Sequence, residues 1–164
     1  MAQVFVSIGS NIDRDRNIRL AIEALKNQFG ELLLSTIYES EAVGFDGDNF
    51  YNLVAAFETP DDVTKVADQL RLMEADLGRE RNSPRFSSRT MDIDLLLYDD
   101  LVYQSDNLTL PRDEILHNAF VLKPLSELIG DRIHPLAQQS YSELWQAYDV
   151  SSQPLWPVTV ALQD

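Results

Sequence analysis

The sequence of residues 50–78 is FYNLVAAFETPDDVTKVADQLRLMEADLG, and this stretch decides the fold because a strand leads directly into a helix. Residues 50–58 are predicted to form the strand. Thr59 and Pro60 then supply a cap and a first-turn proline for the helix, and the two aspartates that follow favour its dipole. Gly78 is expected to end the helix. Its apolar side chains are spaced along one face: Val63, Val66, Ala67, Leu70, Met73 and Leu77.

A strand and a helix are also predicted upstream of this stretch. Residues 3–8 form a buried strand that ends at Gly9-Ser10-Asn11. A helix follows from about Arg14 to Gln28, with Ile18, Ile22, Leu25 and Phe29 spaced as one apolar stripe. Residues 31–39 form a second strand, whose connection to residues 50–58 is too long for a tight hairpin.

A further strand is predicted at residues 90–98. The order is then β-α-β-β-α-β, which is typical of the ferredoxin-like α+β fold, with two helices on one side of an antiparallel sheet. The C-terminal half adds two short strands and two short helices, and Ser140 and Glu143 form a capping-box pattern. We expect one domain over residues 1–164 and assign no structure to the tail from Ser151. The added elements are expected at 101–104, 107–110, 124–129 and 141–148.

Composition excludes several classes of function. The net charge is −14, from 13 Lys and Arg against 27 Asp and Glu, so non-specific binding to nucleic acid or an anionic membrane is not expected. The absence of cysteine excludes disulfides, a thiol nucleophile and a zinc–thiolate site. No leader peptide or membrane span is recognisable, so the cytoplasm is the expected compartment, and the chain is expected to be a monomer or a weak dimer.

The richest functional signal is the sequence EADLGRERNSPRFSSRTMDID, residues 74–94. Asp92 and Asp94 lie in the predicted strand, where alternate side chains share a face, with Cα atoms roughly 6.5–7 Å apart. Carboxylate pairs of this kind can hold divalent cations, and arginine suits phosphate oxygens. The segment therefore favours a magnesium–nucleotide site. Its arginines fall in an 11-residue loop: Arg79, Arg81, Arg85 and Arg89.

Simpler interpretations of the same residues remain open. The aspartates could be the solvated face of a strand whose other face, Met91, Ile93, Leu95 and Leu97, packs in the core. An arginine-rich loop could likewise be only solvated.

Several segments, in order, resemble the 6-hydroxymethyl-7,8-dihydropterin pyrophosphokinase family of folate biosynthesis. The similarity covers about residues 4–148. It is carried by the segments VSIGSN (6–11), YESEAVG (38–44), FYNLVAAFET (50–59), LGRERNSPRFSSRTMDIDLLLYDD (77–100) and FVLKPLSEL (120–128).

This resemblance implies a transfer of pyrophosphate from ATP to the hydroxymethyl group of a reduced pterin, with release of AMP. It implies two Mg²⁺ ions that are held by Asp92 and Asp94, and it implies ATP as the co-substrate. The catalytic residues implied are Arg79, Arg89, Asp92 and Asp94. The implied ATP-binding residues are Glu74, Arg79, Arg81, Arg85, Arg89 and Arg112. The implied pterin-binding residues are Ser40, Val43, Phe50, Asn52 and Phe120.

The sequence departs from the family pattern on the ATP side. Arg112 stands where the family commonly has histidine, and Asn118 stands where it commonly has arginine. Two alternatives therefore stay open. One is a catalytically weakened paralogue that binds a pterin or nucleotide without efficient transfer. The other, argued without the family, is a two-metal nucleotidyltransferase.

Overall fold

The computed structural model describes residues 1–42, 47–79 and 91–162, with the Arg79 side chain left out. The first seven elements confirm the predicted β-α-β-β-α-β order, except that the second strand is divided in two. The division lies at Ser35, whose hydroxyl accepts the backbone N–H of Val54 at 2.9 Å and so replaces a ladder bond. The elements are β1 (Ala2–Ser10), α1 (Arg14–Phe29), β2 (Leu33–Leu34), β3 (Ile37–Ser40), β4 (Phe50–Thr59), α2 (Val63–Arg79) and β5 (Asp92–Tyr98).

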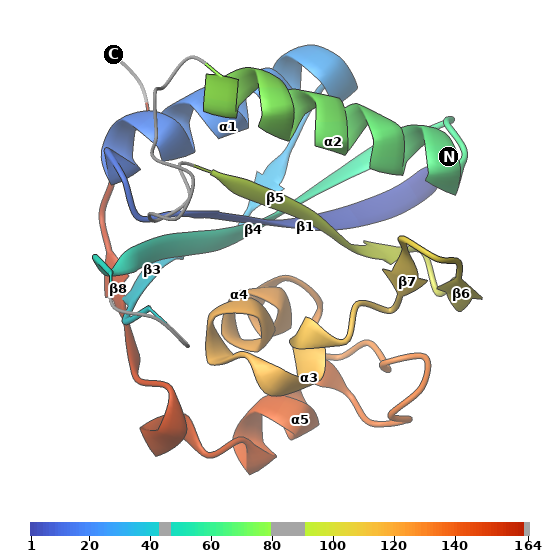
Figure 1. Ribbon diagram of the computed structural model, residues 1–164. Helices are drawn as coiled ribbons and strands as arrows, with labels where there is room; N and C mark the ends of the chain where they lie inside the picture. Colours follow the sequence, from blue (N-terminus) through green and yellow to red (C-terminus); the bar gives the residue numbers. More distant parts are fainter. Residues whose placement is uncertain (43–46, 80–90, 163–164) are drawn as a thin grey trace.

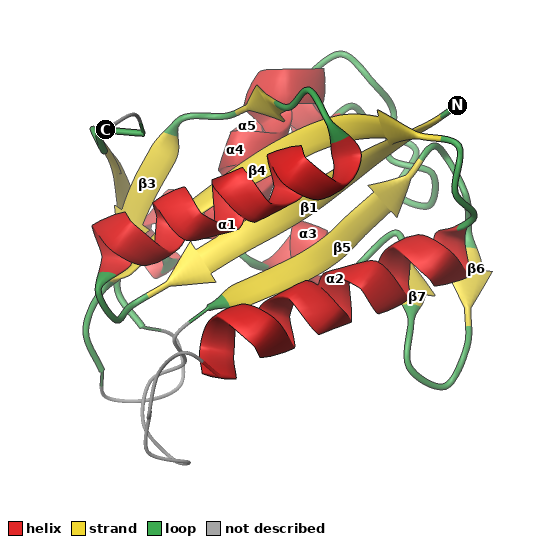
Figure 2. Ribbon diagram, turned by 90° about the horizontal axis from the view of Figure 1, so that it is seen from above, coloured by secondary structure: helices red, strands yellow, loops and turns green. Residues whose placement is uncertain are grey.

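The main sheet has the strand order β5-β1-β4-β3-β8, with β2 also paired to β4, and its adjacent strands are antiparallel. Each of the first two helices joins strands that have one other strand between them. This is the split arrangement of a ferredoxin-like sheet, so the predicted fold class is confirmed. Figure 2 shows α1 and α2 lying side by side over one face of the sheet.

The face under α1 and α2 is closed by an apolar core. Ile18, Ile22 and Leu25 of α1 and Val66 and Leu70 of α2 pack there against alternate side chains of β1 and β4. These residues belong to the two predicted apolar stripes. This face of the sheet is therefore used for stability.

The beginning of α2 differs from the prediction. Thr59 belongs to β4, and the helix begins at Val63. Asp62 supplies the cap, because its Oδ1 accepts the N–H of Lys65 at 2.9 Å, and this bond lowers the pKa of the Asp62 carboxyl. At the other end the helix continues past Gly78 to Arg79.

The opposite face of the sheet is covered by helices from the C-terminal half, as Figure 1 shows. They are α3 (Glu114–His117), α4 (Ala119–Ile129) and α5 (Tyr141–Ala147). The predicted helix near 124–129 thus begins earlier, at Ala119, and α3 was not predicted. The capping box of Ser140 and Glu143 is confirmed. Phe5, Leu96 and Leu122 are among the residues of a second apolar core on this face.

A β-bulge in β5 changes which face its last residues occupy. Leu95 pairs with Val6 but Leu97 pairs with Phe5, so one extra residue, Leu96, lies between them. Leu97 therefore packs in the second core, and the expectation that it shares the face of Met91, Ile93 and Leu95 is wrong. The bulge also leaves the Leu96 carbonyl to accept the N–H of Arg112 at 3.0 Å.

The remaining elements are short. The predicted strands at 101–104 and 107–110 shrink to β6 (Tyr103–Gln104) and β7 (Thr109–Leu110), which pair with each other. The tail contains a 3₁₀ turn, η1 (Val150–Ser152), and a strand, β8 (Leu155–Val158), that pairs with β3. Among the described residues, no helix is long and apolar enough to cross a membrane.

Candidate functional site

A cavity of about 360 Å³ lies on the sheet face that carries α3 and α4. It brings together predicted pterin, nucleotide and metal residues that are up to 80 positions apart in the sequence, Ser40 to Phe120. The predicted residues that line it are Ser40, Phe50, Asn52, Asp92, Asp94, Arg112 and Phe120. Those that the sequence did not identify as site residues are Ser7, Gly9, Glu41 and Glu114.

The strand register explains why these side chains meet. Gly9 of β1 pairs with Asn52 on one side and with Asp92 on the other, and Ser7 pairs with Asp94. Residues directly opposite each other in a sheet project from the same face. The strand β1, which lies between β4 and β5, thus contributes only small residues between Asn52 and the two aspartates. These residues form the floor of the cavity.

The amide of Asn52 is fixed at the bottom of this floor. Its Nδ2 donates to the Ser40 hydroxyl at 3.1 Å, and both side chains are buried. A Cβ at Gly9 would lie 2.7 Å from Asn52 Oδ1, so only glycine leaves room for the amide in this orientation. The amide keeps donor and acceptor groups together, as recognition of a heterocycle edge requires.

The sheet and the helix layer of α3 to α5 each contribute one aromatic ring to the lining. Phe50 comes from the beginning of β4, and Phe120 comes from the first turn of α4. Both rings are partly exposed. Aromatic faces of this kind suit a flat heterocycle, since stacking adds to the burial of apolar surface.

The other side of the cavity is charged. Arg112 Nη2 lies 3.5 Å from Asp94 Oδ1 and 2.9 Å from Glu114 Oε1, and its Nε also donates to Glu114 at 3.2 Å. The side chains of Arg112 and Asp94 are about one third exposed. Among the described residues that line the cavity, Arg112 is the only cation. A bound phosphate would therefore compete with two carboxylates for it.

The other predicted ATP-side residues are placed differently. Glu74 does not line the cavity; its Oε1 accepts the N–H of Ile93 at 2.9 Å, between the two aspartates along β5. Arg79 is the last residue of α2. The pterin-side residue Val43 and the loop residues Arg81, Arg85 and Arg89 lie outside the described residues.

Two of the lining residues that were not predicted, Ser7 and Gly9, are recognisable in the sequence by their pattern. Ser7 and Gly9 interrupt an otherwise apolar buried strand at alternate positions, which places a small polar gap on one face. Glu114 precedes Asn118 by four residues and has no recognisable motif. Its role as the ion-pair partner of Arg112 depends on the loop geometry after β7.

Asp92 and Asp94 fit a magnesium site that is completed by substrate. Both line the cavity from one strand, and carboxylate oxygens are the ligands Mg²⁺ prefers. The described residues contain no cluster of three or more His, Cys, Asp or Glu side chains suited to holding a metal. Mg²⁺ often binds through one or two carboxylates and takes its other ligands from phosphates and water, so two carboxylates are sufficient.

Comparison with known proteins identifies relatives of the whole fold. The family model described as 7,8-dihydro-6-hydroxymethylpterin-pyrophosphokinase (HPPK) matches residues 5–130. The 2-amino-4-hydroxy-6-hydroxymethyldihydropteridine pyrophosphokinases of Haemophilus influenzae and Aquifex aeolicus are 31% and 33% identical to the chain. These matches cover 84% and 87% of the chain, and 88% and 90% of the respective relatives.

Longer proteins also contain a similar region. The folic acid synthesis protein fol1 of Pneumocystis carinii is 33% identical over 94% of the chain, which spans only 21% of that protein. A solved HPPK-DHPS structure in complex with substrates has a TM-score of 0.73 at 11% identity, covering 93% of this chain and 46% of the other. At that identity the likeness concerns the fold, which agrees with the sheet order described above.

Proposed function

Because the chain belongs to the 7,8-dihydro-6-hydroxymethylpterin-pyrophosphokinase family, we propose that it transfers the pyrophosphoryl group of ATP to the hydroxymethyl group of 6-hydroxymethyl-7,8-dihydropterin and releases AMP. We propose further that residues 1–164 form a single pyrophosphokinase-like domain, whose product enters folate biosynthesis.

One observation carries the proposal: a single cavity has an aromatic side, which is neutral apart from the exposed Glu41, and a charged side. A reaction between a flat heterocycle and a polyphosphate needs both environments in contact. The neutral side supplies the Asn52 amide and two phenylalanines, and the charged side supplies Asp92 and Asp94. This pairing of environments favours transfer between two substrates over the binding of one.

On the neutral side, Phe50 and Phe120 hold the pterin ring and Asn52 binds its pyrimidine edge. The bond from Asn52 to Ser40 fixes the amide before the substrate arrives. A fixed amide loses little conformational freedom on binding, so more of the interaction energy appears as affinity.

On the charged side, Asp92 and Asp94 hold magnesium, two ions when ATP is bound, and arginines bind the triphosphate. Magnesium bound there would neutralise phosphate charge and polarise the attacking hydroxyl. Arg112 contributes once it exchanges Glu114 for a phosphate oxygen, and the loop that contains Arg81, Arg85 and Arg89 supplies further cations. Glu74 acts through the β5 backbone, where it holds Ile93 between the two aspartates.

The chemistry demands positioning more than covalent participation by the protein. The hydroxymethyl oxygen forms a bond to the β-phosphorus, the bond from that phosphorus to the oxygen bridging the α-phosphate breaks, and the hydroxyl proton is released. Holding the two substrates in line in one cavity converts a bimolecular encounter into a reaction of a bound pair.

The test is to identify the product formed from ATP. With ATP, Mg²⁺ and 6-hydroxymethyl-7,8-dihydropterin, the protein should release AMP in proportion to pterin consumed. Release of inorganic pyrophosphate in its place would establish a nucleotidyltransferase and overturn the proposal. Pterin binding in a calorimeter without AMP release would establish the weakened paralogue.

The pterin side is tested separately by calorimetry. Phe50→Ala, Phe120→Ala and Asn52→Ala should each weaken pterin binding by about 1–3 kcal/mol, through lost stacking or an underpaired ring edge. Tyr103→Ala, in β6 and outside the cavity lining, serves as an aromatic control. Unchanged pterin affinity in all three variants would contradict the assignment.

A further inference from the structure

We propose that the C-terminal strap, residues 148–158, positions the pterin side of the cavity, and that Gln153 is its main positioning residue. The inference rests on the proposed function and deepens it. The strap lies beyond residue 130, where the match to the family model ends. It is attached at two places, and each attachment holds a different wall of the cavity.

The first attachment is to the beginning of α4. Gln153 Oε1 accepts the N–H of Ala119 at 3.0 Å. Its Nε2 donates to the His117 carbonyl and to Asn118 Oδ1, both at 3.2 Å. The hydroxyl of Tyr148 also donates to the His117 carbonyl, at 2.7 Å. One amide therefore satisfies donor and acceptor groups of the α3–α4 junction.

This junction determines where a cavity ring lies. Phe120 follows Ala119 directly, in the first turn of α4, and it lines the cavity. The first N–H groups of a helix have no partner within the helix, so an external acceptor fixes the position of that turn. Gln153 supplies this acceptor although it does not line the main cavity itself.

The second attachment is to β3. The strand β8 pairs antiparallel with β3, and Leu155 lies opposite Ser40, the partner of the Asn52 amide. Opposite Glu39 lies Trp156, whose indole Nε1 donates to Glu39 Oε1 at 3.3 Å. The strap thus continues the sheet beyond the strand that supplies Ser40.

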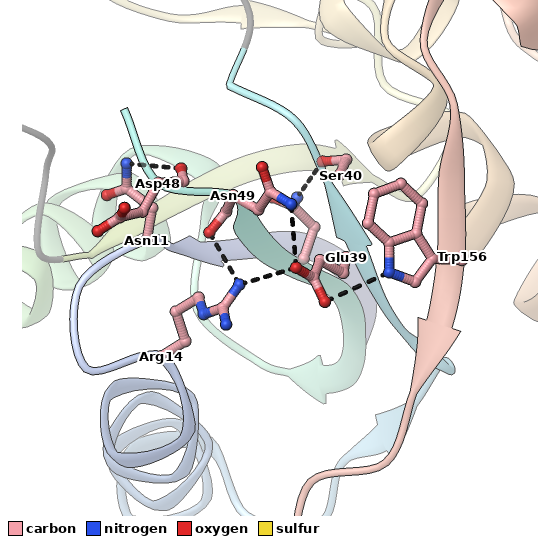
Figure 3. A network of polar contacts seen from close by, with 8 residues as sticks. Asn11, Arg14, Glu39, Ser40, Asp48, Asn49 and Trp156 are labelled. Atoms are coloured by element: carbon pink, nitrogen blue, oxygen red, sulfur yellow. Dashed lines mark hydrogen bonds and ion pairs between the residues drawn. The ribbon is translucent and has the colours of Figure 1, made fainter. Parts of the chain in front are cut away.

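Figure 3 shows Glu39 at the centre of this second attachment. Its Oε2 also accepts from Asn49 Nδ2 and from Arg14 Nη1, both at 3.1 Å. These bonds, with that from Asn49 as the largest contributor, hold the pKa of the Glu39 carboxyl below its usual value. Glu39 is the penultimate residue of β3 and Asn49 directly precedes β4, so the two flank the connection between these strands. The network therefore joins both ends of that connection to the strap.

The strap also forms the wall of a side cavity of about 210 Å³ next to the main one. Ser152, Gln153 and Pro154 line it from the strap. The opposite lining includes Ser40, Glu41 and Phe120, which also line the main cavity. A shift of the strap relative to α4 would therefore move residues on the pterin side, while Asp92 and Asp94 lie on β5, at the opposite end of the sheet from β8.

The experiment compares Gln153→Ala with Gln104→Ala, a control at an exposed glutamine of β6. For each protein, KM for pterin and for Mg-ATP is measured by AMP release, Kd for pterin by calorimetry, and Tm by thermal denaturation. Gln153→Ala should raise the pterin KM and Kd about tenfold, because the aromatic wall is no longer preorganised. The KM of Gln153→Ala for Mg-ATP should change less than about twofold, and so should the KM and Kd values of the control Gln104→Ala. Trp156→Phe removes the bond to Glu39 while keeping an aromatic side chain, and it should raise the pterin Kd about threefold.

Unchanged pterin affinity in both strap variants would overturn the inference. Equal weakening of pterin and ATP would also overturn it, because that result indicates a general loss of structure. If the wild-type protein binds pterin but releases no AMP, the proposed function fails and the pterin Kd values still decide the role of the strap. If the wild-type protein binds no pterin, both proposals fail.

Discussion

The two sides of the cavity are held in different ways. On the neutral side, Asn52 is bonded to Ser40 and enclosed by Gly9, so its polar group is fixed by neutral neighbours. On the charged side, Arg112 lies between Asp94 and Glu114 and is held by carboxylates. The neutral side is formed before a substrate binds, whereas the charged side must exchange partners when phosphates arrive.

This difference bears on where binding energy is used. A preorganised pocket loses little free energy to ordering on binding. A cation that already has carboxylate partners must give up those contacts, and the gain from phosphate is reduced by what is lost. We therefore expect the pterin side to be sensitive to shape and the nucleotide side to be sensitive to charge.

The largest effect is expected at the carboxylates. Asp92→Ala or Asp94→Ala should lower turnover on the order of 100-fold or more, since charge neutralisation by magnesium would be lost. Tm should change little, because both side chains line a cavity and removing one of two like charges does not disrupt a core. Asp131→Ala, at an exposed position, is the control. Turnover above a tenth of wild type in both variants would contradict the metal role and with it the division of the cavity.

A shape change on the neutral side should have the next largest effect. Gly9→Ala places a methyl group 2.7 Å from Asn52 Oδ1 and forces the amide out of its position. Pterin binding measured by calorimetry should weaken by about 1–3 kcal/mol, with ATP binding unchanged. Gly78→Ala is the matched control, because a Cβ there meets nothing within 4 Å. Equal losses for pterin and ATP would show that the two sides are not separable.

A charge change should affect only the nucleotide side. Glu114→Gln frees Arg112 from its shortest ion pair and should tighten Mg-ATP binding by about 1 kcal/mol, roughly fivefold. Arg112→Ala should weaken Mg-ATP binding by about 1.5–3 kcal/mol if this arginine binds phosphate. Glu23→Gln removes the same charge from an exposed site on α1. Tighter binding in Glu23→Gln as well would assign the effect to net charge, and pterin affinity should change in none of the three.

The smallest effect concerns the pH dependence of stability, which limits the pH range over which the two sides can be compared. His134 is buried, which lowers its pKa from 6.5, and its Nδ1 accepts the N–H groups of Leu136 and Ala137 at 3.1 and 3.0 Å. The unfolded chain binds the proton more readily than the folded protein does. The contribution to stability is therefore complete above pH 6.5 and is lost as the pH falls through the folded pKa. Denaturation midpoints from about pH 7.5 to 5.5 should show this decline.

The control for this measurement is His117, which is exposed. His134→Asn, whose amide oxygen can accept in place of Nδ1, should show a flatter pH dependence than wild type, and His117→Asn is measured in parallel as a second histidine substitution. Identical slopes in all three proteins would remove His134 as the cause.

Much of the fold follows from patterns within single segments. The stripes of α1 and α2 and the order of the first six predicted elements were recognisable because each depends on residues close together in the sequence. The bulge at Leu96 was not recognisable from the sequence, since it depends on how β5 pairs with β1. The strand β8 was also missed: its sequence contains Pro157, which is unfavourable within a ladder and is tolerated at the edge of the sheet.

The site residues divide in the same way, into those that the surrounding sequence identified and those whose role depends on a distant part of the chain. Asp92 and Asp94 were identified by their spacing, and Phe50, Asn52 and Phe120 by resemblance; their lining of one cavity agrees with these predictions. Gly9 was interpreted only as the end of a strand, because its function depends on Asn52 in a different strand. The roles assigned to the loop arginines stay predictions.

The bond between Glu74 and Ile93 also concerns how the folded protein meets other copies of itself. The strand β5 is at one end of the sheet, and such edges carry backbone groups that can pair with another chain and begin aggregation. The Glu74 carboxylate occupies the Ile93 N–H at this edge. An incoming strand would have to displace that bond and approach a negative charge. The residue predicted to serve the nucleotide therefore also protects the edge against intermolecular β-pairing.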